Sequence, residues 1–357
     1  MVPWVAAIAA GPDGLPGHHR ASSGDPAVKA TGVAVVGAGW MAGQHLQELA
    51  RRDDVEVRGV CDVDRARAEA AAAPHGAGAF DHWTGMLDAV QPDAVWVCTP
   101  PATHAEVALG AFDRGIPVYL EKPIARHVPD GESIVAGAAR AGVVCAVGYQ
   151  WHASDLLAPL LAALEGRRIG FVLGKNIGGT RPRPWFVDQA VGGGNVLERA
   201  SHHIDLVRAL AGEVTAVQAS ASAVSLGGRP PATGDIEDAL TVVLHLESGA
   251  TATILVVWLR DELPTAYGLE VAADGAYLQL DLDPAFTLHG VAGGREVRVQ
   301  SANPPLRSSI DRFLAAVRAG DPASVPCTPS DALRTLAVAR AVEAALAGGT
   351  TVPVGGS

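Results

Sequence analysis

The sequence predicts an α/β protein in which a doubly wound parallel sheet is followed by an α+β domain with a large, mostly antiparallel sheet. Up to residue 150, short β-branched runs alternate with helical segments, which indicates strands joined by crossover helices. Beyond residue 150, consecutive strand patterns are separated by tight glycine turns, which indicates antiparallel pairing. The length of 357 residues fits two domains of ordinary size.

The first 31 residues differ from the rest of the chain. They are rich in glycine and proline and have no sustained hydrophobic period. The apolar stretch 5–10 is shorter than a signal-peptide core and has no basic segment before it. We therefore expect residues 1–31 to form a flexible tail, in which the adjacent His18 and His19 are solvated rather than bound to a metal.

Residues 32–150 are predicted to form the first domain. Its expected strands are 33–36, 55–61, 94–98, 118–120 and 143–147. Its expected helices are 41–52, 65–73, 83–90, 105–114 and 130–141. This alternation is typical of a doubly wound nucleotide-binding domain.

Residues 151–357 are predicted to form the second domain, including the C-terminal helices. The expected helices are 156–164, 196–211, 308–319 and 330–347. The expected strands are 169–177, 214–223, 239–246, 251–258, 268–273, 276–280 and 296–299. A Pro/Gly-rich loop is expected over 178–194.

Composition excludes several function classes. The chain has 27 Lys and Arg against 38 Asp and Glu, a net charge of −11, which argues against nucleic-acid or anionic-membrane partners. Its apolar runs are all shorter than a membrane span requires. The four cysteines are far apart and form no CxxC pair, so we expect neither a disulfide framework nor a metal site, and a cytoplasmic location.

A glycine-rich turn follows the first predicted strand. Residues 37–42 (GAGWMA) match the dinucleotide pattern G-x-G-x-x-G/A. Gly37 allows the tight turn, Gly39 lets the backbone approach a pyrophosphate, and the small Ala42 permits close packing of helix on strand. Since the helix N-terminus also offers free N–H groups, we expect this Rossmann-type loop, with Trp40 and Met41, to bind a dinucleotide.

Asp62 stands at the end of the second predicted strand, at the spacing expected for a carboxylate that binds the adenosine ribose. Such a carboxylate would repel a 2′-phosphate, so NAD is favoured over NADP. Arg65 and Arg67 are nearby and could weaken this discrimination.

Three further motifs follow in order: CTPPATH (98–104), EKP (121–123) and GGGNVLERASHHIDL (192–206). Together with the glycine turn, the chain resembles the Gfo/Idh/MocA oxidoreductases, a family that includes glucose–fructose oxidoreductase and inositol dehydrogenase. The resemblance covers about residues 32–350. It implies a nicotinamide-dependent enzyme that forms homodimers or homotetramers.

By this resemblance, Thr99, Pro100 and His104 belong to the cofactor cleft, and Glu121 and Lys122 lie beside the nicotinamide ribose and the substrate. Lys122 follows a strand of the predicted parallel sheet, and ligands bind at the carboxyl ends of such strands. An ammonium group there can polarise a carbonyl or stabilise an alkoxide.

A second constellation lies on the predicted helix 196–211. Glu198, His202 and Asp205 share one face of an α-helix, so a carboxylate could raise the basicity of the imidazole and orient it. By resemblance, His202 is the catalytic residue, and Glu198 replaces the aspartate that the family has four residues before it. His203 points elsewhere on the helix and is secondary. For Asp205, a packing role is as reasonable as a catalytic one.

Four other residues are candidate substrate contacts. Tyr149 and His152 lie in the segment that enters the second domain, where they could instead pack in a hinge. Lys175 lies on the first strand of the second domain, and Arg183 lies in the loop RPRPWF (181–186), which could equally form an interface.

These observations predict an NAD-dependent oxidoreductase acting on a sugar, cyclitol or sugar derivative, with His202 as general acid/base and Lys122 as electrostatic assistant. Two alternatives remain: a redox-neutral NAD-using hydrolase or lyase of the same fold, and a non-catalytic NAD- or sugar-binding sensor. Residues 251–259 (TATILVVWL) are apolar on both sides of their alternation, which hints at a second buried face, such as a subunit contact.

Overall fold

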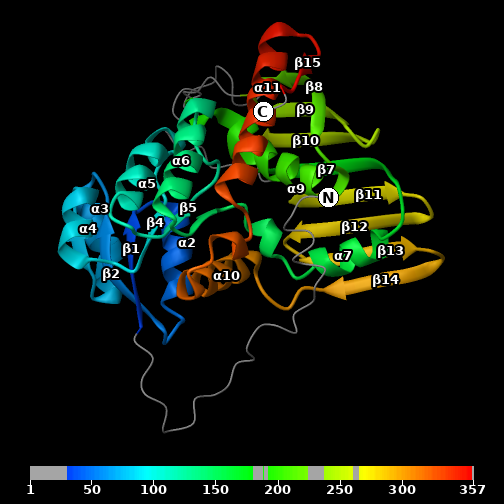
Figure 1. Ribbon diagram of the computed structural model, residues 1–357. Helices are drawn as coiled ribbons and strands as arrows, with labels where there is room; N and C mark the ends of the chain where they lie inside the picture. Colours follow the sequence, from blue (N-terminus) through cyan, green and yellow to red (C-terminus); the bar gives the residue numbers. More distant parts are fainter. Residues whose placement is uncertain (1–29, 180–187, 189–191, 224–236, 260–264, 356–357) are drawn as a thin grey trace.

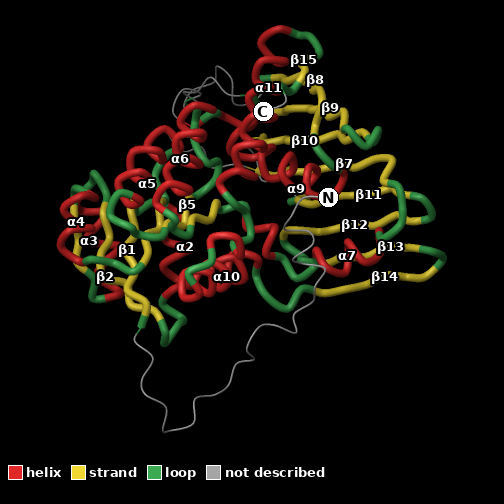
Figure 2. Tube along the Cα trace, viewed as in Figure 1, coloured by secondary structure: helices red, strands yellow, loops and turns green. Residues whose placement is uncertain are grey.

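A computed structural model of the chain describes residues 30–179, 188, 192–223, 237–259 and 265–355. The predicted tail lies almost entirely outside the described residues. Two sheets lie side by side, with helices on both faces of one and between the two (Figures 1 and 2). The predicted fold class is confirmed.

The first sheet has six parallel strands in the order β3-β2-β1-β4-β5-β6. The chain reverses direction across the sheet between β1 and β4, the position at which doubly wound proteins bind ligands. All six residues of β1 are buried, as expected of a central parallel strand. The strands are β1 (Thr31–Val36), β2 (Val55–Cys61), β3 (Gly78–Phe80), β4 (Ala94–Val97), β5 (Val118–Leu120) and β6 (Cys145–Val147).

Five crossover helices accompany this sheet: α2 (Trp40–Leu49), α3 (Arg65–Ala72), α4 (Trp83–Val90), α5 (His104–Phe112) and α6 (Val128–Ala141). A sixth helix, α10 (Pro305–Ala319), comes from the far end of the chain and covers the same sheet (Figure 1). Its Phe313 meets Trp96 and Tyr119 edge-on, with ring centroids 5.2 and 5.4 Å apart. The sequence analysis assigned α10 to the second domain, because a hydrophobic period shows that a face is buried but not against which sheet.

The second sheet has nine strands in the order β14-β13-β12-β11-β7-β10-β9-β8-β15. Only β7 and β10 pair in parallel; the other neighbours are antiparallel. The strands are β7 (Ile169–Gly179), β8 (Val214–Ser222), β9 (Ala239–Leu246), β10 (Thr251–Leu259), β11 (Ala266–Ala273), β12 (Ala276–Asp283), β13 (Thr287–Ala292), β14 (Arg295–Gln300) and β15 (Val352–Pro353).

The sequence analysis missed the short edge strands β3 and β15 and also β13. In β13, Gly290 has φ +144°, and a Cβ there would lie 2.1 Å from the carbonyl oxygen of Tyr277. A glycine within a strand weakens the sequence pattern, yet here it allows close approach of the next strand.

Within the described ranges, the helices that contact the nine-stranded sheet lie on one face of it (Figure 1). Helix α9 (Ser201–Ala211), entered through a π-helical turn (Val196–Ala200), packs on β7 and β10. Helix α11 (Pro329–Gly348) contacts α6, α9 and β8 and so joins the two halves, while α7 (Leu157–Leu164) lies near β12 and β13. The division near residue 150 stays a prediction. No helix in the described ranges is long and apolar enough to cross a membrane.

Candidate active site

The turn after β1 requires its glycines for two different reasons. Gly37 has φ +92°, and a Cβ on it would lie 2.7 Å from the carbonyl oxygen of Cys98. Gly39 is the N-cap of α2, which has no side-chain cap, and a Cβ there would meet nothing within 4 Å. The first glycine is therefore needed by the fold, and the second leaves open space in front of a helix N-terminus, as an anion site requires.

Asp62 lies beside this turn at the end of β2. Its Oδ2 accepts a hydrogen bond from the amide of Ala38 at 2.8 Å, and its Oδ1 accepts one from Asp64 at 2.9 Å. Nearby, Trp40 is 58% exposed at the start of α2, and Met41 is half-buried. This arrangement fits a dinucleotide, with the pyrophosphate at Gly39 and the ribose at Asp62.

The loop after β4 lies against the glycine turn, through Cys98 and Thr99. The Thr103 hydroxyl donates a hydrogen bond to the Thr99 hydroxyl at 2.9 Å, and Pro100 is exposed. His104 is fully buried; its Nε2 lies 2.9 Å from the Thr99 carbonyl oxygen and its Nδ1 3.0 Å from that of Pro123. Thus His104, which was predicted to contact the cofactor, contacts the backbone of the loops that follow β4 and β5.

Glu121 and Lys122 follow β5 at the carboxyl edge of the sheet. Glu121 is 6% exposed, and its Oε1 lies 2.7 Å from Nε2 of His45 on α2. Burial tends to raise the pKa of Glu121, but the contacts with His45 and Lys122 outweigh burial and lower it. Glu121 is therefore a buried, ionised carboxylate next to Lys122.

The Lys122 ammonium points to the segment that carries His202. Its Nζ donates to Oε2 of Glu198 at 2.6 Å and to the Glu198 carbonyl oxygen at 2.9 Å. The Lys122 side chain is 8% exposed and that of Glu198 is 23% exposed. A charge-assisted contact of this length holds the ammonium in a partly desolvated position.

His202 is the second residue of α9 and is the predicted general acid/base. Its imidazole is half-buried and meets the fully buried ring of Tyr149 edge-on, with centroids 5.6 Å apart. Burial lowers its pKa well below the ordinary value, and the positive charge of Lys122 lowers it further. The charge of Lys122 therefore acts on His202, and the lowered pKa makes the imidazole neutral. The catalytic roles of the two residues stay a prediction.

The predicted face of Glu198, His202 and Asp205 does not form. Glu198 lies in the π-helical turn, which widens the spacing of side chains and turns Glu198 toward Lys122 instead of His202. His202 accordingly has a lowered pKa, not the raised basicity that the sequence analysis expected from a carboxylate partner. His203 faces the sheet, where its ring packs on Gly174 and its Nε2 lies 3.2 Å from the Gly268 carbonyl oxygen.

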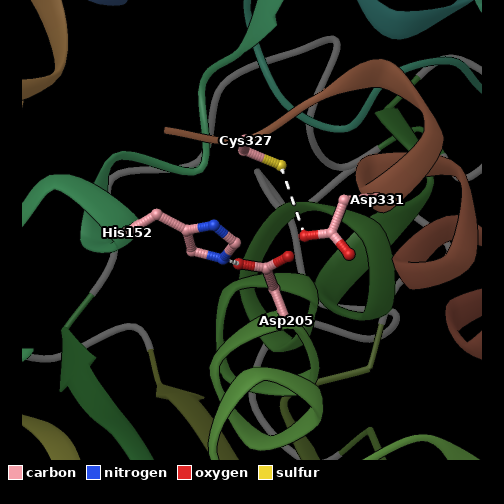
Figure 3. A group of neighbouring side chains, drawn as sticks. All are labelled: His152, Asp205, Cys327 and Asp331. Atoms are coloured by element: carbon pink, nitrogen blue, oxygen red, sulfur yellow. Dashed lines mark hydrogen bonds and ion pairs between the residues drawn. The ribbon is translucent and has the colours of Figure 1, made fainter. Parts of the chain in front are cut away.

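Asp205 faces a different partner, His152 (Figure 3). Both side chains are essentially unexposed; Nε2 of His152 contacts Oδ2 of Asp205, and its Nδ1 lies 3.0 Å from the Pro326 carbonyl oxygen. Burial lowers the pKa of His152, but Asp205 outweighs this and raises it. His152 was a candidate substrate contact with hinge packing as the alternative; both of its nitrogens contact protein atoms, which fits the packing alternative.

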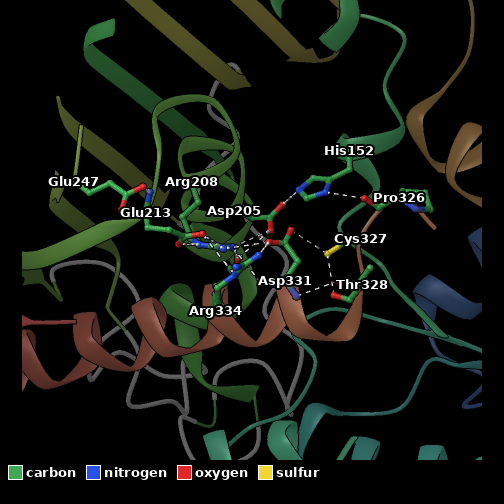
Figure 4. Close-up of polar contacts among 11 residues, drawn as sticks. His152, Asp205, Arg208, Glu213, Glu247, Pro326, Cys327, Thr328, Asp331 and Arg334 are labelled. Carbon is green, nitrogen blue, oxygen red and sulfur yellow. Dashed lines mark hydrogen bonds and ion pairs between the residues drawn. The ribbon is translucent and has the colours of Figure 1, made fainter. Parts of the chain in front are cut away.

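This pair belongs to a buried network at the junction of α9 and α11 (Figure 4). Arg208 donates to both carboxylate oxygens of Glu213 at 2.8 Å, to Asp331 at 3.2 Å and to Thr335 at 2.6 Å. His152, Asp205, Cys327 and Asp331 offer ligand atoms within 4.8 Å of one another, a spacing that a metal ion could use. Since the two aspartates already face His152 and Arg208, we interpret the cluster as an ion-pair network.

One predicted substrate contact, Lys175, faces away from this site. Lys175 and Gly174 are neighbours on β7, so the Lys175 side chain and the Cα hydrogen side of Gly174 that would carry a Cβ point to opposite faces of the sheet. Because Gly174 meets His203 of α9, Lys175 points to the uncovered face, where its Nζ lies 2.5 Å from Oε1 of Glu270. Arg183 lies outside the described residues.

Sequence comparison matches both halves of the chain to one family. Residues 31–149 match an oxidoreductase family with an NAD-binding Rossmann fold, and residues 168–290 match the GFO/IDH/MocA C-terminal domain. An inositol 2-dehydrogenase from Arthrobacter sp. (strain FB24) is 30% identical over 255 residues, 69% of this chain and 71% of that protein. The chain belongs to the Gfo/Idh/MocA oxidoreductase family.

Another relative and a solved structure match almost the whole chain. Inositol 2-dehydrogenase 2 from Saccharopolyspora erythraea is 29% identical over 90% of this chain and 95% of its own length. The structure of a levoglucosan dehydrogenase complex with NADH has a TM-score of 0.81 at 18% identity and covers 92% of this chain and 100% of its own. The predicted family and its oxidoreductase class are confirmed. Sequence reasoning did not single out His45, whose partner Glu121 is far along the chain, or Arg208, which bonds Asp331 and Thr335 from a distant helix.

Proposed function

We propose that this enzyme transfers a hydride between NAD and a secondary hydroxyl or carbonyl carbon of a sugar, cyclitol or related polyol. The observation that carries the proposal is the placement of the Lys122 ammonium and the neutral His202 imidazole at one edge of the sheet, on the side of the dinucleotide turn. Relatives named for inositol support the polyol substrate class.

Bound NAD supplies the hydride acceptor or donor at its nicotinamide ring. In the oxidative direction, His202 accepts the hydroxyl proton of the substrate while hydride leaves the same carbon. Lys122 exchanges its contact with Glu198 for the substrate oxygen and stabilises the alkoxide that develops there. As that negative charge grows, it offsets the repulsion of Lys122 on His202, so the proton affinity of the imidazole rises when it is needed.

Three further points complete the proposal. NAD is favoured over NADP, since Arg65 and Arg67, the cations near Asp62, are paired with Glu69 at 2.9 Å and Asp64 at 3.2 Å. The uncovered face of the nine-stranded sheet supports a homodimer or homotetramer. Four free cysteines support a reducing, cytoplasmic location.

The test is to follow NADH absorbance with a panel containing myo-inositol, levoglucosan and common aldoses, for the wild type and three variants. Lys122→Met and His202→Ala should each lower kcat by roughly 100-fold or more, while NAD still stabilises the protein in thermal shift. Lys175→Met is the matched control, because this lysine also pairs with a glutamate but on the opposite face, and its kcat should equal that of the wild type.

Retained turnover in Lys122→Met or His202→Ala would refute the assigned roles. Formation of product with no net change in the amount of NADH would favour the redox-neutral alternative. Ligand binding by the wild type with no turnover on any substrate would favour the sensor.

A further inference from the structure

A buried polar chain connects the dinucleotide-binding helix to Lys122. His45 lies on α2, the helix that begins at the glycine turn, and has no exposed surface. Its Nε2 holds Oε1 of Glu121 at 2.7 Å, and Oε2 of Glu121 accepts the backbone N–H of Lys122 at 3.2 Å. The same lysine then reaches Glu198 with its ammonium. The helix, the β5 loop and the π-helical turn are thus linked in series.

The surroundings fix the His45–Glu121 pair in one geometry. A Cβ at Gly148 would lie 3.2 Å from both carboxylate oxygens of Glu121, so a larger residue there would press on the carboxylate and displace it slightly. The ring of Tyr119 meets the imidazole of His45 edge-on, with centroids 5.0 Å apart. Nδ1 of His45 is buried and has no hydrogen-bond partner among the described residues, so the hydrogen bond of this side chain goes to Glu121.

A buried carboxylate without a donor is costly, and it would turn toward any other cation within reach. For Glu121, that cation is the neighbouring Lys122, whose charge already acts on it. His45 therefore keeps Glu121 from capturing the ammonium and leaves it free for Glu198 and the substrate.

We infer that His45 is a positioning residue for Lys122: it anchors Glu121 and thereby fixes the lysine relative to the dinucleotide turn. The catalytic part of this inference rests on the proposed hydride transfer. The structural part, which concerns the accessibility of Lys122, does not.

The test compares His45→Gln with His45→Asn. Both substitutions remove the ring that packs on Tyr119, so their packing losses are similar. The Gln amide reaches the place of Nε2 and can still donate to Glu121, whereas the Asn amide lies near Nδ1 and cannot. We expect His45→Asn to lower kcat roughly tenfold to a hundredfold at saturating NAD, and His45→Gln to restore most of it. His45→Asn should also melt at a lower temperature than His45→Gln, because it leaves the buried Glu121 carboxylate without this donor. His289→Asn, which breaks a surface contact of 3.1 Å with Asp281, should leave kcat unchanged.

A second readout needs no turnover. The chain has only three lysines, Lys29, Lys122 and Lys175, so acylation by an amine reagent can be followed site by site by peptide mass spectrometry. With Lys175 as internal reference, Lys122 should be labelled several-fold more slowly in His45→Asn than in the wild type, because the ammonium then turns to the buried Glu121, and at the wild-type rate in His45→Gln. The proposal requires a change in Lys122 alone.

Two results would overturn the inference: wild-type kcat and wild-type labelling in His45→Asn, or equal impairment of the Asn and Gln variants. A wild-type enzyme that transfers no hydride would contradict the proposed function, and the labelling result would then decide the role of His45 by itself.

Discussion

Replacing Arg208 should greatly lower the free energy of unfolding. Its side chain is 1% exposed and makes five hydrogen bonds, to Glu213, Asp331 and Thr335. Arg208→Met keeps the length of the side chain but leaves these acceptors without their donor. Breaking a buried ion pair in this way costs about 3–5 kcal/mol. We expect the lower end, about 3 kcal/mol, because Arg334 remains 2.8 Å from Asp331.

The assay is thermal unfolding. If the predicted second domain, residues 151–357, unfolds as one unit, a loss of about 3 kcal/mol lowers its Tm by roughly 6–12 °C. Arg168→Met is the matched control, since the Arg168 side chain is 91% exposed in its pair with Asp274 and should leave Tm unchanged. A Tm decrease of less than roughly 3 °C in Arg208→Met would refute the view that this network joins α9 to α11.

Four other substitutions have defined outcomes. Gly37→Ala should fold poorly, because of φ +92° and the approach to Cys98, whereas Gly39→Ala should fold normally and weaken NAD binding about tenfold (~1.4 kcal/mol), as measured by titration. Asp62→Ala should narrow the ratio of kcat/KM for NAD over that for NADP. Burial lowers the pKa of His203 from 6.5 to about 4, so the unfolded chain takes up this proton first as pH falls through that window, and the free energy of unfolding decreases. His203→Gln should show a shallower decrease in urea unfolding between pH 6.5 and 4; an identical slope would contradict this.

The order of the elements could be predicted because each depends on local pattern. The strands at β2, β5 and β9 have the predicted bounds, and the glycine turn has the predicted position between β1 and α2. In contrast, the packing of α10 on the first sheet depends on contacts such as Phe313 with Trp96, which are separated by most of the chain. A period identifies the apolar face of a helix and gives no information about its partner.

Residue types at the site could be predicted better than their pairing. Lys122 and His202 were brought together by two motifs with known places on the fold. Lys175 was misplaced because, in a strand, a single step along the chain moves a side chain to the other face. His152 was misjudged because its partner, Asp205, was expected to face His202.

Both errors around His202 have one physical cause, the π-helical turn Val196–Ala200. An α-helix would have put Glu198 one turn before His202, as the spacing of four residues implied. The wider turn directs Glu198 to Lys122 instead, where a glutamate has the reach to hold the ammonium at 2.6 Å while its own carbonyl oxygen accepts a second hydrogen bond. The carboxylate therefore faces Lys122 and not His202. In the proposed mechanism, this leaves a neutral His202 imidazole to accept the proton and the Lys122 ammonium to stabilise the alkoxide, which is the combination that oxidation of an alcohol requires.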